Sequence, residues 1–472
     1  MTCLINPEKY SADAEIIKFI KRKYMKRKKK MSSAKIILMG FFGIIIIGSL
    51  LLSLPISHAE GVEVSYIDAL FTATTATCVT GLVTLPTVSA WSVFGQAVIL
   101  LLIQIGGLGF ITVFAGFMMI MGKKLDMEER ILISDSFNLT SLSGIQKFVC
   151  KAIFFTFIVE ALGAFSYMTV FIPEFGAKGI WMSVFNSVSA FCNAGMDIVA
   201  ENSLCNYVHN PTVNITTMLL IITGGIGFIV WFDMERAIQN KRKKKSGFLS
   251  LHTKITLSVT AFLIAVGAIL IFIFEYNNPL TMKDYSIGEK IMASLFQSVT
   301  TRTAGFATVM QENLSESSAF VSMLLMFVGG SPAGTAGGIK TVTAFVLILT
   351  FLSTIKNKRT VDAFGRQISY DSIKKAVSVF TSSFLIMVLS TVLVLASGGG
   401  NVLDVLYETV SATATVGLTR NLTAGLNEVC KMIIIMTMYF GRVGPISLAF
   451  ALSSDKCEEN RVANPVEEIS IG

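Results

Sequence analysis

Charged residues are scarce in this chain. Lys, Arg, Asp and Glu make up 15% of its 472 residues, whereas 53% are hydrophobic, and the mean hydropathy of +0.67 lies far above that of an average soluble domain. Eight long apolar runs are nearly free of charge, and each has the roughly 20 residues that a helix needs to cross about 30 Å of hydrocarbon. These runs cover residues 36–57, 93–121, 148–172, 212–232, 255–274, 318–355, 376–397 and 429–453. The sequence therefore predicts a polytopic membrane protein.

Histidine is almost absent, and cysteine is scattered. The three histidines and seven cysteines contain no CxxC pair and no spacing typical of a metal site, so we expect neither a zinc site nor a disulfide framework. No Ser or Cys is spaced with a histidine and an acid as a hydrolytic site requires. No segment matches the GxxxxGK[ST] pattern of the loop that cradles a phosphate. We expect a protein that is not an enzyme and that binds no cofactor or nucleotide itself.

Positive charge is gathered in a few segments. The formal net charge is +8, and the basic run Lys21–Lys30 precedes the first apolar run. The links after the second, fourth and sixth runs are also basic, at 123–130, 241–245 and 356–375. If the spans alternate, these links lie on one side of the membrane, which is then the cytoplasmic side and holds both termini. Anionic membrane lipids are compatible partners of these links, and the charge requires no nucleic acid.

Glycine recurs at a nearly constant spacing. Four segments contain it in a similar setting: TCVTGL at Thr77–Leu82, CNAGM at Cys192–Met196, RTAGF at Arg302–Phe306 and ATVGL at Ala414–Leu418. Their glycines, Gly81, Gly195, Gly305 and Gly417, are separated by 114, 110 and 112 residues. Such a period indicates one supersecondary unit that is used four times around a shared axis.

A short amphipathic stretch precedes each of these glycines. The stretches are Tyr66–Thr77, Trp181–Phe191, Ile291–Thr301 and Leu403–Thr413. A helix of about 10–12 residues reaches only half-way through a bilayer, and its C-terminal carbonyls must then meet protein, water or an ion. Four such ends directed at one axis place partial negative charge there, which favours a cation.

The residues that follow each half-helix are expected to run extended, so that their carbonyls replace the hydration shell of a cation. A glycine in that stretch can adopt a positive φ and turn its carbonyl inward. For a single glycine the alternative is close packing of helices, but four glycines in register favour a cation filter. A second glycine element, such as IGGLGF at Ile105–Phe110 and TGGIGF at Thr223–Phe228, is sufficiently explained by kinking and packing of the second spans.

The third quarter departs from the others. Its run GGSPAGTAGGIKT, Gly329–Thr341, interrupts an apolar stretch, and no helix is expected to remain intact through it. Irregular backbone at membrane depth must be buried in protein or line a water-filled cavity. The alternative is a transmembrane helix with a flexible kink and no role in opening or closing a pore. Arg442 lies inside the last apolar run, where a cation is costly and usually functional; the alternative for Arg442 is an ion pair elsewhere in the bundle.

Two further charges, Arg302 and Glu408, lie within the half-helix stretches. They are candidates for a buried pair behind the third and fourth glycine segments, or for solvated positions near the outer mouth. Glu160 lies within an otherwise apolar run. A proton relay usually needs more than one titratable group, so a structural role is favoured for this carboxyl.

The repeated unit of span, half-helix, glycine segment and span resembles the Trk/Ktr/HKT superfamily of potassium transporters. The resemblance covers the chain after residue 35 and is strongest to the Ktr-type membrane subunit. It implies an all-α membrane protein in which four span–pore-helix–span repeats, with eight transmembrane helices in all, surround one central pore in pseudo-fourfold arrangement. It implies a basic cytoplasmic N-terminus at 1–35, repeats at 36–124, 145–245, 250–358 and 372–454, and a cytoplasmic tail at 455–472.

The resemblance also assigns residues. The potassium-binding filter segments match Val79, Thr80, Gly81, Asn193, Ala194, Gly195, Thr303, Ala304, Gly305, Thr415, Val416 and Gly417. The gate residues match Gly329, Gly330, Gly334, Thr335, Gly337, Gly338, Lys340 and Arg442. Because a serine at the first filter glycine accompanies sodium selectivity in the superfamily, glycine at all four positions resembles the potassium-selective type.

The function implied is potassium uptake across the plasma (inner) membrane of a bacterium through a gated, channel-like pore. The implied partners are a second copy of the chain, in a homodimer, and a cytosolic ring of nucleotide-binding regulatory subunits. Sodium remains open as an activator or as a co-transported ion. The alternative is a sodium-selective or cation-coupled secondary carrier. Carriers usually place titratable pairs at a midplane site, whereas this chain offers carbonyl-rich segments and Glu160 alone.

Overall fold

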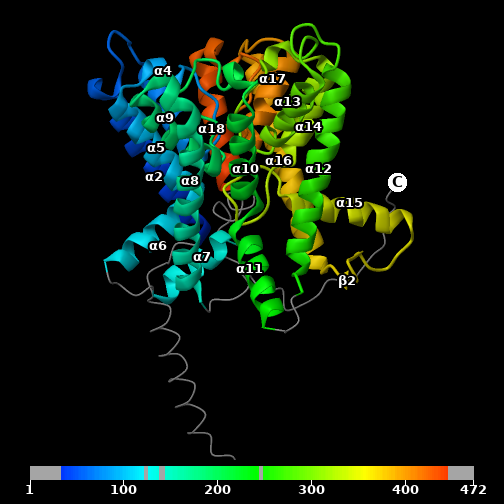
Figure 1. The fold of residues 1–472 in the computed structure, drawn as a ribbon. Coiled ribbons are helices and arrows are strands. Elements are labelled where there is room, and N and C mark those ends of the chain that lie inside the picture. Colours follow the sequence, from blue (N-terminus) through cyan, green and yellow to red (C-terminus); the bar gives the residue numbers. More distant parts are fainter. Residues whose placement is uncertain (1–32, 122–125, 138–143, 244–247, 445–472) are drawn as a thin grey trace, which may run out of the picture.

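The structure is a computed structural model that describes residues 33–121, 126–137, 144–243 and 248–444. The predicted basic N-terminus through residue 32, the predicted cytoplasmic tail at 455–472 and the end of the fourth predicted repeat lie outside the described residues. Figure 1 shows a bundle of roughly parallel helices, from which α6, α11 and α15 diverge near the lower end.

Four long helices form the frame of the bundle, and each begins one of the predicted repeats. They are α2 (Ser33–Leu52), α8 (Ile145–Phe175), α12 (Leu251–Glu275) and α16 (Tyr370–Ala396). Each is long and apolar enough to cross a membrane as a single helix. Capping hydroxyls start two of them, because Ser250 accepts from Thr253 N and Ser369 accepts from Ser372 N.

Two expected spans are not single helices. The run 93–121 forms α5 (Val93–Leu108) and α6 (Phe110–Ile120), which are bent by 96°, and the run 212–232 belongs to α10 (Pro211–Ile226) and α11 (Phe228–Arg242), bent by 89°. The prediction of a kinked but continuous span is therefore wrong at these two places. The reason lies in Gly109 and Gly227, which adopt φ of 83° and 95°, a conformation that breaks a right-handed helix and that glycine adopts without a Cβ clash.

The helix break in the third quarter occurs where the sequence predicts it. Helix α14 (Glu316–Phe327) ends before the glycine run, and α15 (Thr341–Ile355) begins after it. Residues 328–340 contain no helix; a parallel bridge joins Val328 to Ile339. We call residues 328–340 the intramembrane loop. The last described helix is α18 (Glu428–Val443).

The other elements are short. Four helices, described with the site, are α3 (Tyr66–Cys78), α9 (Lys178–Cys192), α13 (Ile287–Thr300) and α17 (Val402–Ala414). The remaining helices are α4 (Thr87–Ala90) and α7 (Met127–Phe137), with single 3₁₀ turns at Pro55–Ser57, Cys205–Tyr207, Gln311–Asn313 and Thr423–Gly425. Strands β1 (Asp362–Ala363) and β2 (Arg366–Gln367) pair antiparallel in a small hairpin.

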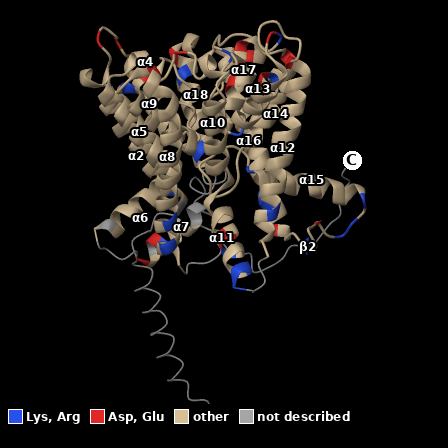
Figure 2. Ribbon diagram, viewed as in Figure 1, with Lys and Arg blue, Asp and Glu red and all other residues tan. Residues whose placement is uncertain are grey.

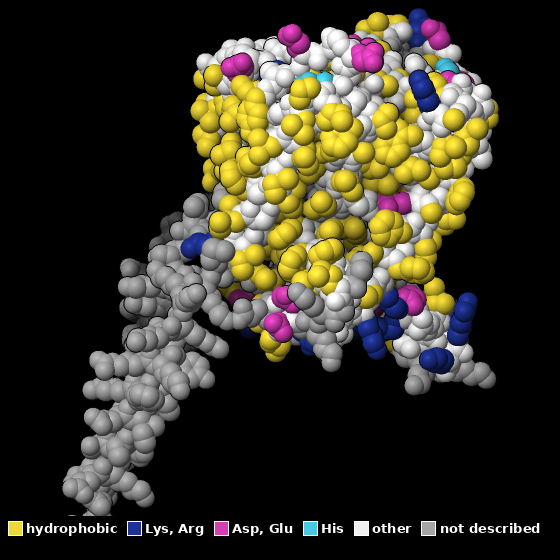
Figure 3. Space-filling model, turned by 90° about the vertical axis from the view of Figure 1, so that its left-hand side faces the viewer, with side chains coloured by type: hydrophobic (Ala, Val, Ile, Leu, Met, Phe, Trp, Pro, Cys, Tyr) yellow, Lys and Arg dark blue, Asp and Glu magenta, His cyan; other side chains and the backbone are white. Residues whose placement is uncertain are grey.

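The surface fits a membrane environment. Charged residues gather at the two ends of the bundle (Figure 2), and one face carries a broad apolar belt between these ends (Figure 3). On α8 the side chains of Phe154, Leu162 and Phe165 are 65–69% exposed, which would be unfavourable in water over so large a patch. By length and composition the described residues contain four spans, or six if each bent pair is one span.

Candidate functional site

Four short helices end at the four predicted glycine segments. Helices α3, α9, α13 and α17 have 13, 15, 14 and 13 residues, so each is about 20 Å long. Capping side chains start three of them, at Ser65, Ser286 and Asn401. The last two turns of each helix are almost entirely buried, so these helices end inside the protein.

The backbone after each short helix repeats the same conformation. The residue two positions before the glycine has a left-handed φ of 56°, 60°, 63° and 51° at Val79, Asn193, Thr303 and Thr415. The glycines themselves have φ of 97°, 67°, 82° and 98° in the same order. The segments are thus non-helical, but the expectation of a uniformly extended chain is wrong. Left-handed residues alternate with the others, and for a non-glycine residue that conformation is uncommon.

The four glycines lie against one another in cyclic order. A Cβ atom built on Gly81 would meet the carbonyl oxygen of Ala194, and one on Gly195 would meet that of Ala304. A Cβ on Gly305 would meet the carbonyl oxygen of Val416, and one on Gly417 would meet that of Thr80. Each separation would be below 3.0 Å, so a larger side chain has no room at any of the four positions. The structure therefore brings segments more than 100 residues apart in sequence into a closed ring.

Hydroxyl groups on the short helices hold three of these segments. Thr75 Oγ1 accepts a hydrogen bond from Gly81 N at 2.9 Å, and Ser411 Oγ accepts one from Gly417 N at 3.0 Å. In the second repeat Ser189 Oγ accepts from Met196 N at 3.1 Å. These bonds tie the amide groups of three segments to the short helices that precede them.

The sequence interpretation missed these hydroxyl residues. A signal existed, since Thr75, Ser189 and Ser411 each lie six residues before the glycine of their repeat. In the third repeat Thr300 lies five residues before Gly305, and its hydroxyl instead donates to the carbonyl oxygen of Phe306 at 2.6 Å.

The second glycine element packs against the ends of the short helices. A Cβ on Gly106, Gly224 or Gly441 would clash with the carbonyl oxygen of Thr77, Phe191 or Thr413, respectively. Each of these carbonyls belongs to the last turn of a short helix. Close backbone approach, the packing role expected for these glycines, is therefore what they provide.

The intramembrane loop lies against the ends of α13 and α17. Gly329 would meet Thr303 if it carried a Cβ, and Gly337 would meet Thr415 and Ala414. Backbone hydrogen bonds fix the loop to the second repeat, from Ser331 N to Gly225 O at 2.9 Å and from Phe228 N to Ala333 O at 3.0 Å. The loop and the filter-like ring are thus in direct contact.

Two positively charged side chains, of Arg442 and Lys340, donate hydrogen bonds to carbonyl oxygens of this loop. Arg442 Nη1 donates to Thr335 O at 2.6 Å, and its Nη2 donates to Gly106 O of α5. Lys340 Nζ donates to Ala336 O at 2.6 Å and to Gly337 O at 3.4 Å. No carboxylate of the described residues lies within salt-bridge distance of either side chain. An ion pair elsewhere in the bundle therefore does not account for Arg442 in this part of the chain.

The pair suggested for Arg302 and Glu408 does not form. Arg302 is 6% exposed, and its Nη2 donates to Gly329 O at 3.3 Å. Glu408 is fully buried and accepts hydrogen bonds from the hydroxyls of Thr419 and Thr423. Neither side chain is solvated at an outer mouth, so both expectations are wrong. Arg302, in the turn after α13, and Glu408, within α17, thus have different neighbours.

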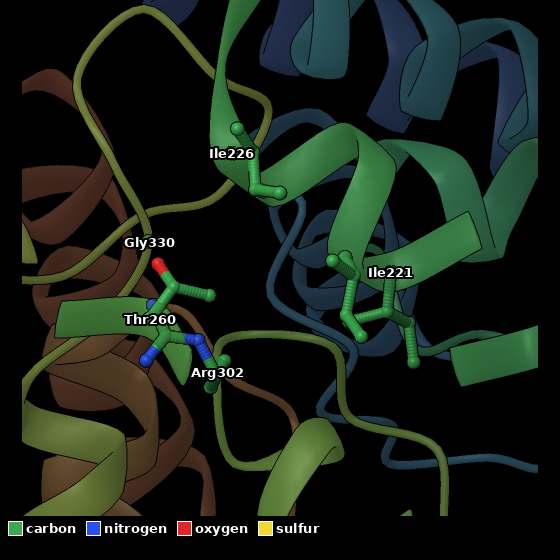
Figure 4. A pocket seen from close by; sticks show the side chains of 7 residues that line it. Ile221, Ile226, Thr260, Arg302 and Gly330 are labelled. Carbon is green, nitrogen blue, oxygen red and sulfur yellow. The ribbon is translucent and has the colours of Figure 1, made fainter. Parts of the chain in front are cut away.

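The Arg302 side chain borders a small cavity beside the loop. Figure 4 shows it near Thr260 of α12 and Gly330 of the loop, with Ile221 and Ile226 of α10 on the other side of the cavity. Its Nη1 and the hydroxyl of Thr260 have no hydrogen-bond partner among the described residues. The guanidinium is therefore held mainly by one carbonyl of the loop.

Glu160 lies behind the second short helix. Gln104 Nε2 donates to its Oε2 at 3.3 Å, and Cys192 Sγ lies 3.8 Å from its Oε1. The parts of the chain that the structure describes contain no group of three His, Cys, Asp or Glu side chains that could hold a metal ion. The polar centre of the molecule is built from backbone carbonyls and hydroxyls.

Comparison with known proteins places this arrangement in a family. Residues 15–460 match the family model described as TrkH, cation transport protein. The Ktr system potassium uptake protein B of Bacillus subtilis is 39% identical over 444 residues, which is 94% of this chain and 97% of that protein. The potassium/sodium uptake protein NtpJ of Enterococcus hirae is 38% identical over 453 residues, covering 94% and 98% of the two chains.

A solved structure supports the same fold. The crystal structure of the potassium transporter TrkH from Vibrio parahaemolyticus superposes with a TM-score of 0.71 at 17% identity, over 91% of this chain and 86% of that one. With the family match and the two relatives, the conclusion is that this chain belongs to the TrkH family of cation transport proteins.

Proposed function

We propose that the chain takes up potassium ions across the plasma membrane through a central pore. The observation that carries the proposal is the closed ring of Gly81, Gly195, Gly305 and Gly417 at the ends of four short helices. The names of relatives, a Ktr system potassium uptake protein and a potassium/sodium uptake protein, support transport of a monovalent cation. The transported ion is driven inward by a membrane potential that is negative inside.

In this proposal eight helices cross the membrane in four pseudo-fourfold repeats, at 36–124, 145–245, 250–358 and 372–454. The crossing helices are α2, α5, α8, α10, α12, α14, α16 and α18. Helices α3, α9, α13 and α17 act as pore helices. Helix α14 is only 12 residues long, less than a full span, and the intramembrane loop occupies the remaining depth.

Potassium is held by backbone carbonyls of the ring, in segments Val79–Gly81, Asn193–Gly195, Thr303–Gly305 and Thr415–Gly417. Carbonyl oxygens replace the hydration shell of the ion. The C-terminal ends of the pore helices add partial negative charge in a site from which bulk water is excluded. The hydrogen bonds that the hydroxyls of Thr75, Ser189 and Ser411 accept from backbone amides support this role, because they orient the segments.

The intramembrane loop acts as the gate in this proposal, with Gly329, Gly330, Gly334, Thr335, Gly337, Gly338 and Lys340 as its residues and Arg442 as its latch. Its contacts with Thr303 and Thr415 place it next to the ring. The bond from Arg442 to Thr335 connects it to α18. Conduction requires this loop to move aside.

The assembly is proposed from the relatives. The name of a relative, Ktr system potassium uptake protein B, implies a partner component, and we propose that this chain works as a homodimer on a cytosolic ring of nucleotide-binding subunits. Both termini are then cytoplasmic, in agreement with the basic links.

The test is ion uptake in bacterial cells that lack their own potassium uptake systems, with and without a co-expressed ring subunit. Wild type is expected to restore growth at low potassium. Gly81→Ser is expected to lower the preference for potassium over sodium, because its Cβ would displace the carbonyl of Ala194.

Gly61→Ser provides the matched control. Gly61 also has a positive φ, of 77°, but nothing lies within 4 Å of its Cβ position. Gly61→Ser should therefore keep the wild-type preference for potassium over sodium. An unaltered preference in Gly81→Ser, in protein that is present in the membrane at normal abundance, would contradict the filter. Restored sodium uptake without potassium uptake in wild type would favour the sodium-selective carrier instead.

A further inference from the structure

The first residue of each filter segment differs among the four repeats. The residues are Val79, Asn193, Thr303 and Thr415, and all are at least 99% buried. The hydroxyls of Thr303 and Thr415 have no hydrogen-bond partner in the described part of the chain, and valine has none to offer. Asn193 alone of the four has a side-chain amide, which can both donate and accept hydrogen bonds.

The amide of Asn193 connects two different segments. Its Nδ2 donates to the carbonyl oxygen of Arg302 at 3.3 Å, and Arg302 immediately precedes the third filter segment. Its Oδ1 accepts from the hydroxyl of Thr335 in the intramembrane loop at 3.0 Å. The loop is therefore joined to two neighbouring filter segments through one side chain.

Thr335 is the point at which these contacts meet. Its hydroxyl also lies 3.1 Å from the carbonyl oxygen of Phe191, the second-to-last residue of α9. Its carbonyl oxygen accepts from Arg442, and its amide donates to Gly224 O at 3.3 Å. Any displacement of the loop at Thr335 must break the bond to Asn193.

A second contact joins the same filter segment to the other end of the loop. The guanidinium of Arg302 donates to the carbonyl oxygen of Gly329 at 3.3 Å. Arg302, just before the third segment, is thus tied to the loop at two points. Its side chain binds Gly329, and its carbonyl oxygen is linked to Thr335 through Asn193. With the loop in place, these contacts together hold the start of the third segment at two points.

We infer that Asn193 is a positioning residue that makes the ion preference of the filter depend on the position of the loop. With the loop in place, Asn193 is held at both ends and fixes the carbonyl of residue 302. When the loop moves, Asn193 loses its Thr335 partner, and that carbonyl gains freedom. The inference rests on the proposed function, and it differs from a simple plug, which changes the flux and leaves the preference unchanged.

The first test compares Thr335→Val with Thr335→Ser in purified protein reconstituted into liposomes. Valine has nearly the shape of threonine but lacks the hydroxyl, and it keeps the carbonyl that binds Arg442. The potassium-to-sodium permeability ratio should fall about fivefold in Thr335→Val, the effect of one ordinary hydrogen bond. Thr335→Ser should restore the wild-type ratio, because the hydroxyl returns.

Ser331→Ala is the matched control within the loop. The Ser331 hydroxyl lies 3.0 Å from the hydroxyl of Thr341, the first residue of α15, and contacts neither Asn193 nor Arg302. This substitution can change the flux but should leave the ratio at the wild-type value. The inference is overturned if Thr335→Val alters the flux with an unchanged ratio, or if Ser331→Ala lowers the ratio equally. If wild type shows no potassium permeability at all, the proposed function fails first.

The second test uses reciprocity, since a gate that changes ion preference must itself respond to the bound ion. Hydrogen exchange of the amides in 331–338 is measured in potassium and in sodium at equal ionic strength. Wild type should exchange more slowly in potassium, and Thr335→Val should lose that difference while remaining folded. Equal exchange of the loop in both ions, with the filter amides protected by potassium alone, would overturn the inference.

Discussion

Arg442 Nη1 donates to the carbonyl oxygen of Thr335 across 2.6 Å, although the two residues are 107 positions apart in the chain. The same guanidinium reaches Gly106 of α5. One side chain of the fourth repeat therefore connects the loop of the third repeat to the second helix of the first.

Replacing Arg442 should release the loop. A hydrogen bond to a charged group contributes about 1.5–3 kcal/mol, so Arg442→Ala is expected to raise potassium flux by about tenfold or more. Flux is measured in liposomes at matched protein density. Arg366→Ala, on the exposed hairpin strand β2, should conduct as wild type does. Unchanged flux in a folded Arg442→Ala protein would exclude the latch.

Shortening the intramembrane loop should have a similar effect. Removal of residues 334–337 takes out the Thr335 junction and the Gly337 contact with Thr415. We expect a higher flux than in wild type, since less backbone then lies below the ring. Flux that is abolished in a protein of normal thermal stability would show that the loop is needed for conduction instead of opposing it.

A comparison of two neighbouring threonines of α3 tests whether the Thr75 hydroxyl supports the first filter segment. Thr75 Oγ1 accepts from Gly81 N, whereas Thr74 Oγ1 donates to Leu70 O within its own helix at 2.7 Å. Both side chains are fully buried. Thr75→Val leaves a buried amide unsatisfied, at a cost of about 1–3 kcal/mol, and should weaken potassium binding by about tenfold. Thr74→Val should bind potassium as wild type does in isothermal titration; equal loss in both variants would contradict the assignment.

The helix-packing glycines can be tested by stability. In Gly106→Ala the new methyl would clash with the carbonyl of Thr77, whereas nothing lies within 4 Å of the same position on Gly43 of α2. Overpacking costs about 1–3 kcal/mol, so Gly106→Ala should lower the melting temperature in detergent. Gly43→Ala should not lower it, because alanine favours a helix more than glycine does. Similar melting temperatures would show that α3 and α5 can separate without cost.

Much of the fold follows from local patterns in the sequence. Apolar length predicts α2, α8, α12 and α16 because a membrane-spanning helix needs little beyond length and low charge. The glycine period predicts where the short helices end. The left-handed residues Val79 and Asn193, which end α3 and α9, lie two positions before the glycines. The break before α15 follows from the density of glycine and proline in 329–341.

Long-range relationships could not be predicted from the sequence. The right-angle bend at Gly227 lies against the backbone of the loop at Pro332 and Ala333, more than 100 residues later in the chain. The partners of Arg302 depend on the turn that follows α13, and those of Glu408 on the rotation of α17; the spacing of charges defines neither. The role of Asn193 required knowing that Thr335, 142 residues later, lies beside it.

The cyclic contact of the four glycines has a genetic consequence. In a pore assembled from four identical chains, a single codon change alters all four sides at once. Here Gly81, Gly195, Gly305 and Gly417 are encoded separately, yet each lies against the next. One substitution therefore changes a quarter of the ring directly and its neighbour by contact. In the proposed filter, ion preference then evolves in small steps while the other sides keep the original geometry.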